Sequence, residues 1–197
     1  TNTASNWQGI RGAAGGLCYL ATDDTYTASY FTGSYDKVVT YLQQNLGAGA
    51  TDSHGWNIEG EGYNQYPMGC FVGGFGIAAK RYDAARDLRN VCAGAPWTLW
   101  TNYANTMKMM GTCMHPDFGD DNAGMSPQGA LGLAFWWCPS ELHPGLAYWY
   151  ERTFGSLGNA NYEAGSAGTI WPILCHPGSA VTPQYPMAMS AWKAGFS

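Results

Sequence analysis

The chain has 197 residues, enough for one large or two small domains with a substantial core, which excludes a disordered tail or a coiled coil. Charged residues make up only 12%, about half the usual share, so the surface must be polar through Ser, Thr, Asn, Gln and Gly. Lys and Arg number 9 against 14 Asp and Glu, and this net charge of -5 excludes the basic surface of a nucleic-acid-binding protein.

Helices separated by glycine are expected in the first part of the chain. Apolar residues at helical spacing predict a helix over 6–20, which Ser5 or Asn6 can cap. The same spacing predicts a second helix over 34–46, with Ser34 as its N-cap. Both predicted helices are amphipathic, so each should bury one face against the rest of the molecule.

A glycine-rich helix is predicted over 60–82, with Pro67 in or near its first turns. Its glycines would allow neighbouring helices to come close. Further helices, three of them opening at or near a proline, are predicted over 82–91, 96–110, 127–138 and 144–154.

The end of the chain has a different pattern. From Thr169 onward, proline and glycine interrupt the helical spacing, which predicts an extended segment over 169–197 after a helical domain of residues 1–168. Helices joined by loops, without alternation of strands and helices, indicate an all-α fold. We expect an incomplete (α/α) toroid of about six to eight helices with an extended C-terminal exit.

The six cysteines are spread along the chain without a CxxC pair, which argues against a zinc ribbon or a thioredoxin-like motif. Their even number and wide spacing favour disulfides and an exported location, extracellular or periplasmic. Cys92 with Cys113 is the preferred pair, because one short loop would then tie consecutive helices; buried free thiols are the alternative.

No apolar run approaches the roughly 18 to 20 residues of a membrane helix, so we expect no membrane span. Thr1 opens the sequence without a basic and apolar leader. We therefore expect that an N-terminal piece has been removed or lies outside this sequence.

The first candidate site is the stretch 54–66, HGWNIEGEGYNQY. It places a histidine, two carboxylates and two tyrosines directly before or at the start of a predicted helix. Such groups can act as acid, base and platform for a sugar ring. The alternative is a polar loop in which Glu59 or Glu61 caps the helix and complements its dipole.

The second candidate site is the stretch 115–122, HPDFGDDN. Asp120 and Asp121 could bind a cation or take part in acid–base chemistry, but their spacing is not that of an EF-hand. An Asp-rich turn that caps the next helix explains them equally well. Side chains from separate loops could also form a metal site, namely His54, Glu61, His115 and Asp117. Such spacing has almost no specificity, so we expect no metal and no cofactor.

The remaining basic residues and histidines that stand out in the sequence are better explained by structural roles than by catalysis or binding. Four of the 9 basic residues lie close together: Lys80, Arg81, Arg86 and Arg89. Such a cluster is usually a solvated helix face, although it can contact an anionic glycan. His143 and His176 each precede a proline and are expected in loops rather than in a catalytic site.

Taken in chain order, three motifs resemble the helical toroid of the heparinase II/III and alginate-lyase type of polysaccharide lyases. They are Asn6-Trp7, then Asp52-x-x-Gly55-x-x-x-Glu59-Gly60-x-x-Tyr63-x-x-Tyr66, then Pro116-x-Phe118-Gly119-Asp120. The resemblance spans most of the chain. It implies a lyase that cleaves a uronate-containing acidic polysaccharide by β-elimination.

The resemblance also implies roles for individual residues. Asn6 matches the residue that neutralises the uronate carboxylate, and Tyr63 or Tyr66 matches the tyrosine that acts as general base, acid or both. Removal of the C5 proton needs both functions. An environment such as Arg11 would have to lower the tyrosine pKa from about 10. The residues expected to bind substrate are Trp7, Arg11, Trp56, Glu59, Glu61 and Asp120.

Members of this family have a longer toroid and a following β-sandwich domain that contributes a histidine, and we expect that domain to begin about where this chain stops. His54 or His115 could replace that histidine, and a separate β-sandwich chain or a homo-oligomer could complete the assembly. Two alternatives stay open. One is a non-catalytic exported carbohydrate-binding or self-assembling subunit, and the other is an inverting glycoside hydrolase with a pair such as Glu61 and Asp120.

Overall fold

The computed structural model describes residues 5–22, 28–45, 64–91, 130–154 and 170–194. In these ranges all regular structure is helical, which confirms the all-α class. The α-helices are α1 (Asn6–Thr22), α2 (Ala28–Asn45), α3 (Gly73–Tyr82), α5 (Ala130–Trp137), α6 (His143–Phe154), α7 (Ile170–Cys175) and α8 (Ser190–Ala194). The others are the π-helix η2 (Asn64–Val72) and the 3-10 turns η3 (Leu88–Asn90), η4 (Ser140–Leu142), η6 (Gly178–Ala180) and η7 (Pro186–Ala188).

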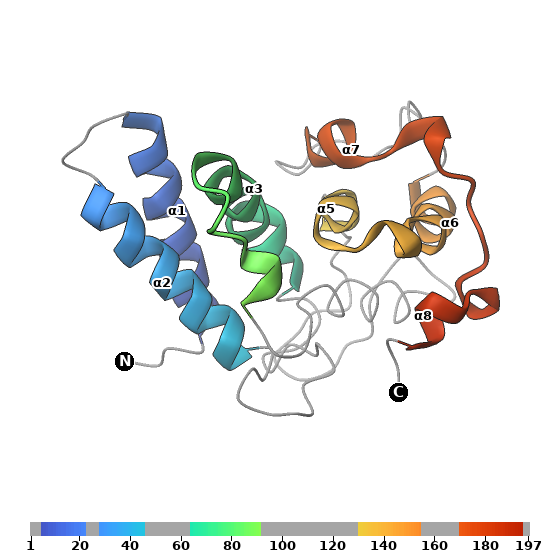
Figure 1. Cartoon of the computed structure of the whole chain (residues 1–197), viewed down its shortest axis with the longest axis horizontal. Coiled ribbons are helices and arrows are strands. Elements are labelled where there is room, and N and C mark those ends of the chain that lie inside the picture. The colour runs from blue at the N-terminus through green and yellow to red at the C-terminus, as the bar shows by residue number, and fades with distance from the viewer. Residues whose placement is uncertain (1–4, 23–27, 46–63, 92–129, 155–169, 195–197) are drawn as a thin grey trace.

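The helices stand side by side in a row. Figure 1 shows α1 and α2 at one end, η2 and α3 next to them, and α5 and α6 at the other end. The segment from α7 to α8 runs along the outside of this second half. The largest fully buried side chains come from both halves: Trp137, Trp192, Tyr41, Tyr150, Phe75, Leu42, Met68 and Leu88.

The helix α1 confirms the prediction for 6–20 and continues to Thr22. Ser5 Oγ accepts a hydrogen bond of 3.3 Å from the Trp7 amide, so Ser5 supplies the expected cap. The helix α2 begins at Ala28, earlier than expected, and Ser34 is a buried residue inside it rather than its N-cap. A small side chain is needed there because α1 comes close to this face of α2 through its glycines.

The glycine-rich region is helical from Asn64 to Tyr82 in the part that the structure describes, but it begins with π geometry. Pro67 lies within η2. Proline has no N–H and its ring obstructs the carbonyl four residues earlier, so the regular α ladder cannot run through these turns. The expected role of glycine in close packing is confirmed at Gly76, where a Cβ atom would lie 2.9 Å from the Trp137 ring of α5.

The predicted helix over 82–91 is wrong. The chain turns after α3 and forms only η3 before Val91. Asp83 Oδ1 accepts a 3.0 Å bond from the Ala85 amide, and Asp87 Oδ1 accepts a 3.1 Å bond from the Arg89 amide. Such local bonds from side chain to backbone compete with helix formation.

The prediction of an extended C-terminal segment is also wrong in the described part, which contains α7, α8 and two 3-10 turns. Tertiary contacts hold these short elements. Trp171 of α7 lies against Gly74 of α3, and its Nε1 donates a 3.2 Å hydrogen bond to the Gly69 carbonyl. Helices this short are not stable on their own, so packing determines their structure.

Candidate functional site

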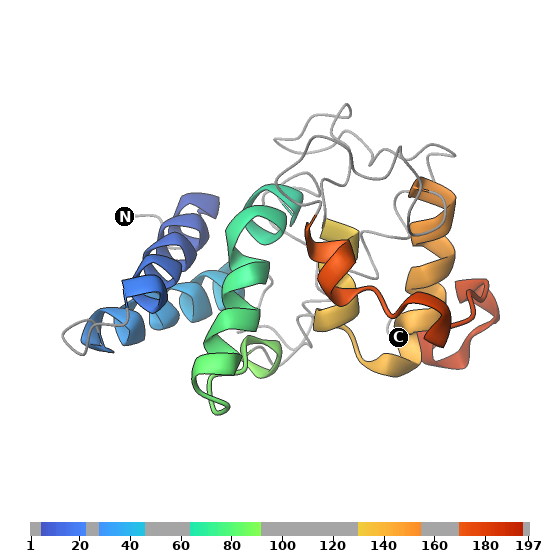
Figure 2. The ribbon, with the colours of Figure 1, turned by 90° about the horizontal axis from the view of Figure 1, so that it is seen from above.

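The candidate site is the end of the helical body at which α1 and η2 begin. Figure 2 shows that α1 and the continuous run of η2 and α3 start at the same end and extend in the same direction. Gly16 of α1 packs against the Phe75 ring of α3, so the two runs are in direct contact. The helix α2 runs antiparallel to α1, and its last residue, Asn45, returns to this end.

Two buried amide side chains mark this end. Asn6 opens α1 and is 6% exposed, and Asn45 closes α2 and is fully buried. Gly9 of α1 faces the Tyr41 ring of α2. Because α1 and α2 run antiparallel, one further turn toward the start of α1 brings Asn6 level with the end of α2, where Asn45 lies. With Ser34, these two are the buried polar residues of the described chain.

Beside Asn6, two predicted substrate-binding residues face solvent. Trp7 is 57% exposed, and Arg11 is exposed one turn further along α1. Arg11 Nε donates a 3.3 Å hydrogen bond to the Trp7 carbonyl, which holds the guanidinium close to the first turn of the helix. A flat indole, a cation and the positive end of a helix dipole therefore lie together, a combination suited to an anionic sugar.

The other predicted site residues are not described at the level of side chains. Tyr66 lies in η2, but only its backbone is described. Outside the described residues lie His54, Trp56, Glu59, Glu61, Tyr63, His115 and Asp120. Their proposed roles, including the hydrolase pair, stay predictions.

The anchors of the two segments that carry these residues are nevertheless placed. Segment 46–63 leaves the body after Asn45, and segment 92–129 leaves it after Val91. Gln43 Nε2, near the end of α2, donates a 3.0 Å hydrogen bond to the Val91 carbonyl. Both segments therefore start from neighbouring points, at the end of the molecule where Asn45 lies.

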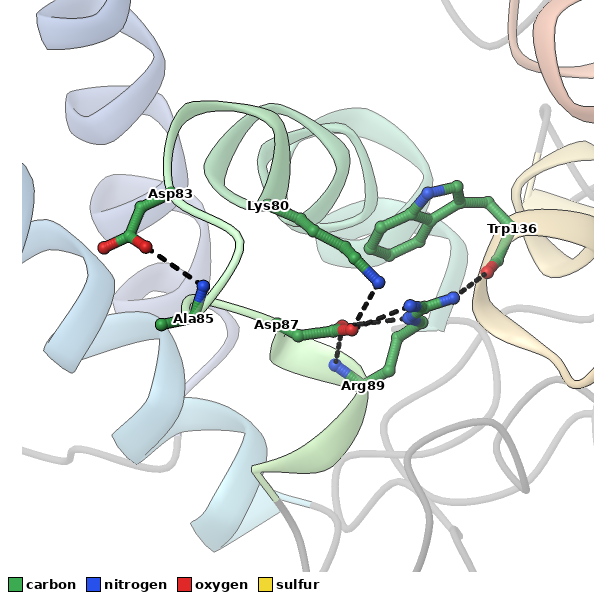
Figure 3. Close-up of polar contacts among 6 residues, drawn as sticks. All are labelled: Lys80, Asp83, Ala85, Asp87, Arg89 and Trp136. Atoms are coloured by element: carbon green, nitrogen blue, oxygen red, sulfur yellow. Dashed lines mark hydrogen bonds and ion pairs between the residues drawn. The ribbon is translucent and has the colours of Figure 1, made fainter.

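The basic cluster is engaged in internal contacts (Figure 3). Arg89 binds Asp87 through two side-chain hydrogen bonds of 2.7 and 2.9 Å, and Lys80 Nζ donates a third of 2.7 Å to the same carboxylate. These bonds, those from Arg89 above all, hold the pKa of Asp87 well below its usual range. The Arg89 guanidinium also lies 4.7 Å from the Trp136 ring centroid, so the cluster joins η3 to α3 and α5.

Arg86 has a similar structural role. Its guanidinium lies 4.9 Å from the Tyr35 ring centroid, and it pairs with Asp83 at 3.5 Å. Burial raises the pKa of Tyr35, although the Arg86 charge opposes this shift. Arg81 is the exposed residue of the basic cluster, and the other three are partly buried and paired internally, so internal pairing explains them better than glycan binding does.

A second cluster, which the sequence analysis did not recognise, joins His143 and His176. The ring of Phe135 packs against both, with its centroid 5.6 Å from that of His143 and 4.5 Å from that of His176. The Tyr150 ring is 4.9 Å from His176. Their positions before prolines suggested loops, but tertiary contacts between α5, α6 and the segment after α7 bring them together.

Metal and thiol chemistry are restricted in the described part. No group of three or more His, Cys, Asp or Glu residues in these ranges could hold a metal ion. Cys18 and Cys175 are free thiols there, and burial raises the pKa of Cys175 to about 11. The expected Cys92–Cys113 pair lies outside the described residues.

None of the described helices is both long and apolar enough to cross a membrane.

Comparison of the chain with protein-family models, curated proteins and solved structures gives no match. The functional argument therefore rests on the residues themselves and on their arrangement.

Proposed function

We propose that this chain is the helical domain of an exported polysaccharide lyase that cleaves a uronate-containing glycan by β-elimination. The observation that carries the proposal is the placement of Asn6. Its side chain is buried at the start of α1, level with Asn45, and α1 begins at the same end of the molecule as η2, which contains Tyr66. Exposed Trp7 and Arg11 flank it on the solvent side.

The chemistry requires two functions at one sugar ring. A base takes the C5 proton, the electron pair forms the C4–C5 double bond, and the C4–O bond breaks as the leaving oxygen receives a proton. Asn6 and the N-terminus of α1 stabilise the carboxylate as negative charge develops.

Tyrosine supplies the proton transfers in this proposal. Tyr66 lies in the first turn of η2, the segment that starts at the same end as α1, and Tyr63 precedes it by three positions. The π geometry of η2 is of a kind that is frequent at functional sites. The acidic polysaccharide would stack on Trp7 and meet Arg11 at the mouth of the site.

We further propose that the helices belong to an incomplete (α/α) toroid. The antiparallel pair α1 and α2 and the row formed with η2–α3, α5 and α6 support this arrangement. A separate β-sandwich chain or further copies of this chain would complete the assembly.

An alternative is an exported carbohydrate-binding or self-assembling subunit without catalysis. A specific observation favours it. Ile170, Ile173 and Leu174 of α7 are 52%, 67% and 64% exposed, although Trp171 of the same helix packs inward. Contiguous exposed apolar surface is typical of interaction sites.

An ultraviolet assay for unsaturated uronate distinguishes the two. The purified chain is offered a panel of acidic polysaccharides, beside Asn6→Ala, Tyr63→Phe and Tyr66→Phe. Tyr82→Phe is the matched control, because Tyr82 is an exposed tyrosine at the far end of α3. Product that disappears in Asn6→Ala and in one of the two site tyrosine variants, but not in Tyr82→Phe, supports the lyase. Glycan binding without product supports the alternative, and neither product nor binding contradicts both.

A further inference from the structure

Residues 176–194 form a strap that lies along the outside of α6. Figure 1 shows this segment running from the end of α7 to α8. The Gln184 amide donates a 3.0 Å hydrogen bond to the Pro144 carbonyl. At its far end, the Trp192 indole lies against Gly145, where a Cβ atom would be 2.5 Å from the ring. The strap is thus held at its middle and at its far end by the start of α6.

His176 holds the near end of the strap. Its ring packs against Phe135 of α5 and Tyr150 of α6, at centroid distances of 4.5 and 4.9 Å. Its Nδ1 accepts a 2.9 Å hydrogen bond from the Gly178 amide, so Nδ1 carries no proton. The neutral ring therefore has its proton on Nε2, which is buried and has no hydrogen-bond partner in the described structure.

A second imidazole, that of His143, also packs against Phe135. His143 Nε2 lies 3.1 Å from the Cys138 carbonyl, and because a carbonyl only accepts, Nε2 is the donor. The titratable groups on the packed elements are His143, Tyr148, Tyr150, Glu151 and Arg152 on α6, Cys138 after α5 and Cys175 at the end of α7. Of these, His143 is the one whose positive charge acts on His176.

We propose that His176 is a proton-sensitive clasp: a proton on Nδ1 would face the Gly178 N–H, remove this hydrogen bond and release the near end of the strap from Phe135 of α5 and Tyr150 of α6. The released imidazole would reach solvent and move away from His143. This agrees with the electrostatics, because burial, and secondly the His143 charge, lower the pKa of His176 below 6.5. A lowered pKa in the folded state means that the clasp is closed above about pH 6.5 and opens as the pH falls below it.

Hydrogen exchange measured by mass spectrometry between pH 7.5 and 5 tests the clasp, with rates corrected for the intrinsic pH dependence of amide exchange. Opening that is linked to one proton should accelerate exchange in peptides of 176–194 by about tenfold per pH unit below 6.5. Peptides of 6–45, in the distant helices α1 and α2, serve as the internal control and should not change. An unchanged rate in the strap of the wild-type protein would overturn the proposal.

Two variants separate the clasp from general acid sensitivity. His176→Asn keeps an acceptor near the Nδ1 position but does not titrate, so the acceleration should disappear. His143→Gln keeps a donor near the Nε2 position and removes the second charge. The folded-state pKa of His176 then lies closer to 6.5, so the acceleration at pH 5 should be smaller than in the wild type. Acceleration that persists unchanged in His176→Asn would overturn the assignment to His176. Should that variant not hold the strap at pH 7.5, an acceleration in His143→Gln as large as in the wild type would overturn it instead.

Discussion

Gly16 of α1 lies so close to Phe75 of α3 that a Cβ atom on Gly16 would overlap the Phe75 ring. This contact joins α1 to the run that starts with η2, and the two runs begin at the same end of the molecule. The placement of Asn6 at the end where η2 starts therefore depends on a glycine ten positions further along α1. Packing in the body of the helices determines the geometry of the candidate site at their end.

The substitution Gly16→Ala should destabilise the protein. The added methyl group would force Phe75 out of its position, and overpacking of this kind costs about 1 to 3 kcal/mol, which exceeds the gain in helix propensity of roughly 0.5 to 1 kcal/mol. Urea unfolding followed by circular dichroism measures the difference. Gly33 is the matched control, because it lies in α2 with nothing within 4 Å of an added Cβ. Gly33→Ala should be neutral or stabilising, and equal effects of the two substitutions would contradict the packing argument.

The substitution Asp87→Asn should lower the free energy of unfolding by about 1 to 3 kcal/mol at pH 7, because it breaks charge-assisted hydrogen bonds to Arg89 and Lys80. The carboxylate is only 11% exposed, so solvent screens these bonds less than it screens an ordinary surface pair. Asp36→Asn is the control, because Asp36 is an exposed carboxylate in α2.

The stability difference between the wild type and Asp87→Asn should depend on pH. The pKa of Asp87 is lower in the folded state than in the unfolded chain, so its contribution is present above an unfolded-state pKa of about 3.9 and is lost as the pH falls through the folded-state pKa. The stability difference between the wild type and Asp87→Asn should be constant above about pH 5 and shrink below about pH 4. A difference that does not change down to about pH 2 would contradict the ion-pair assignment.

The thiol of Cys175 should react slowly with an alkylating reagent. The reactive species is the thiolate, and a pKa of about 11 keeps its fraction small at neutral pH. Its labelling rate, followed by mass spectrometry, should rise about tenfold per pH unit from pH 7 to roughly 9.5 without levelling off. Levelling off near pH 8.5, the ordinary value for a free cysteine, would show that Cys175 is not buried as described. Cys175→Ser should remove the labelled peptide.

Regular periodicity was sufficient to predict the first helix but not the short elements after α3 and in the described part of 170–194. The helix over 6–20 and the all-α class are confirmed because an apolar stripe with a capping serine specifies an amphipathic helix locally. The helix predicted over 82–91 does not form, because the Asp83 and Asp87 carboxylates accept hydrogen bonds from nearby backbone amides and end the helix. The helix α7 was missed, because a contact between Trp171 and Gly74, distant in sequence, is not visible in local spacing.

The candidate site was predictable only in part. The sequence places Asn6 at the start of a helix and Tyr66 near the start of another, and the structure brings these two starts to the same end. The burial of Asn6 was not predictable, because it results from the register between α1 and α2. The clustering of His143 with His176 was not predictable either, since Phe135, which joins them, comes from a third element.

The most direct test of the central claim asks whether the first turn of α1 binds a uronate carboxylate. Binding of an acidic polysaccharide and of the same polymer with its carboxylates reduced to alcohols is measured by calorimetry for the wild type, Asn6→Ala and Asn6→Asp. Gln184→Ala, an exposed amide on the strap, is the matched control. We predict that the wild type binds the acidic polymer more tightly than the reduced one, and that Asn6→Ala weakens binding of the acidic polymer by about tenfold or more. Asn6→Asp should nearly abolish binding of the acidic polymer but still bind the reduced polymer. Equal binding of the acidic polymer by the wild type and by folded Asn6→Ala and Asn6→Asp would contradict the account.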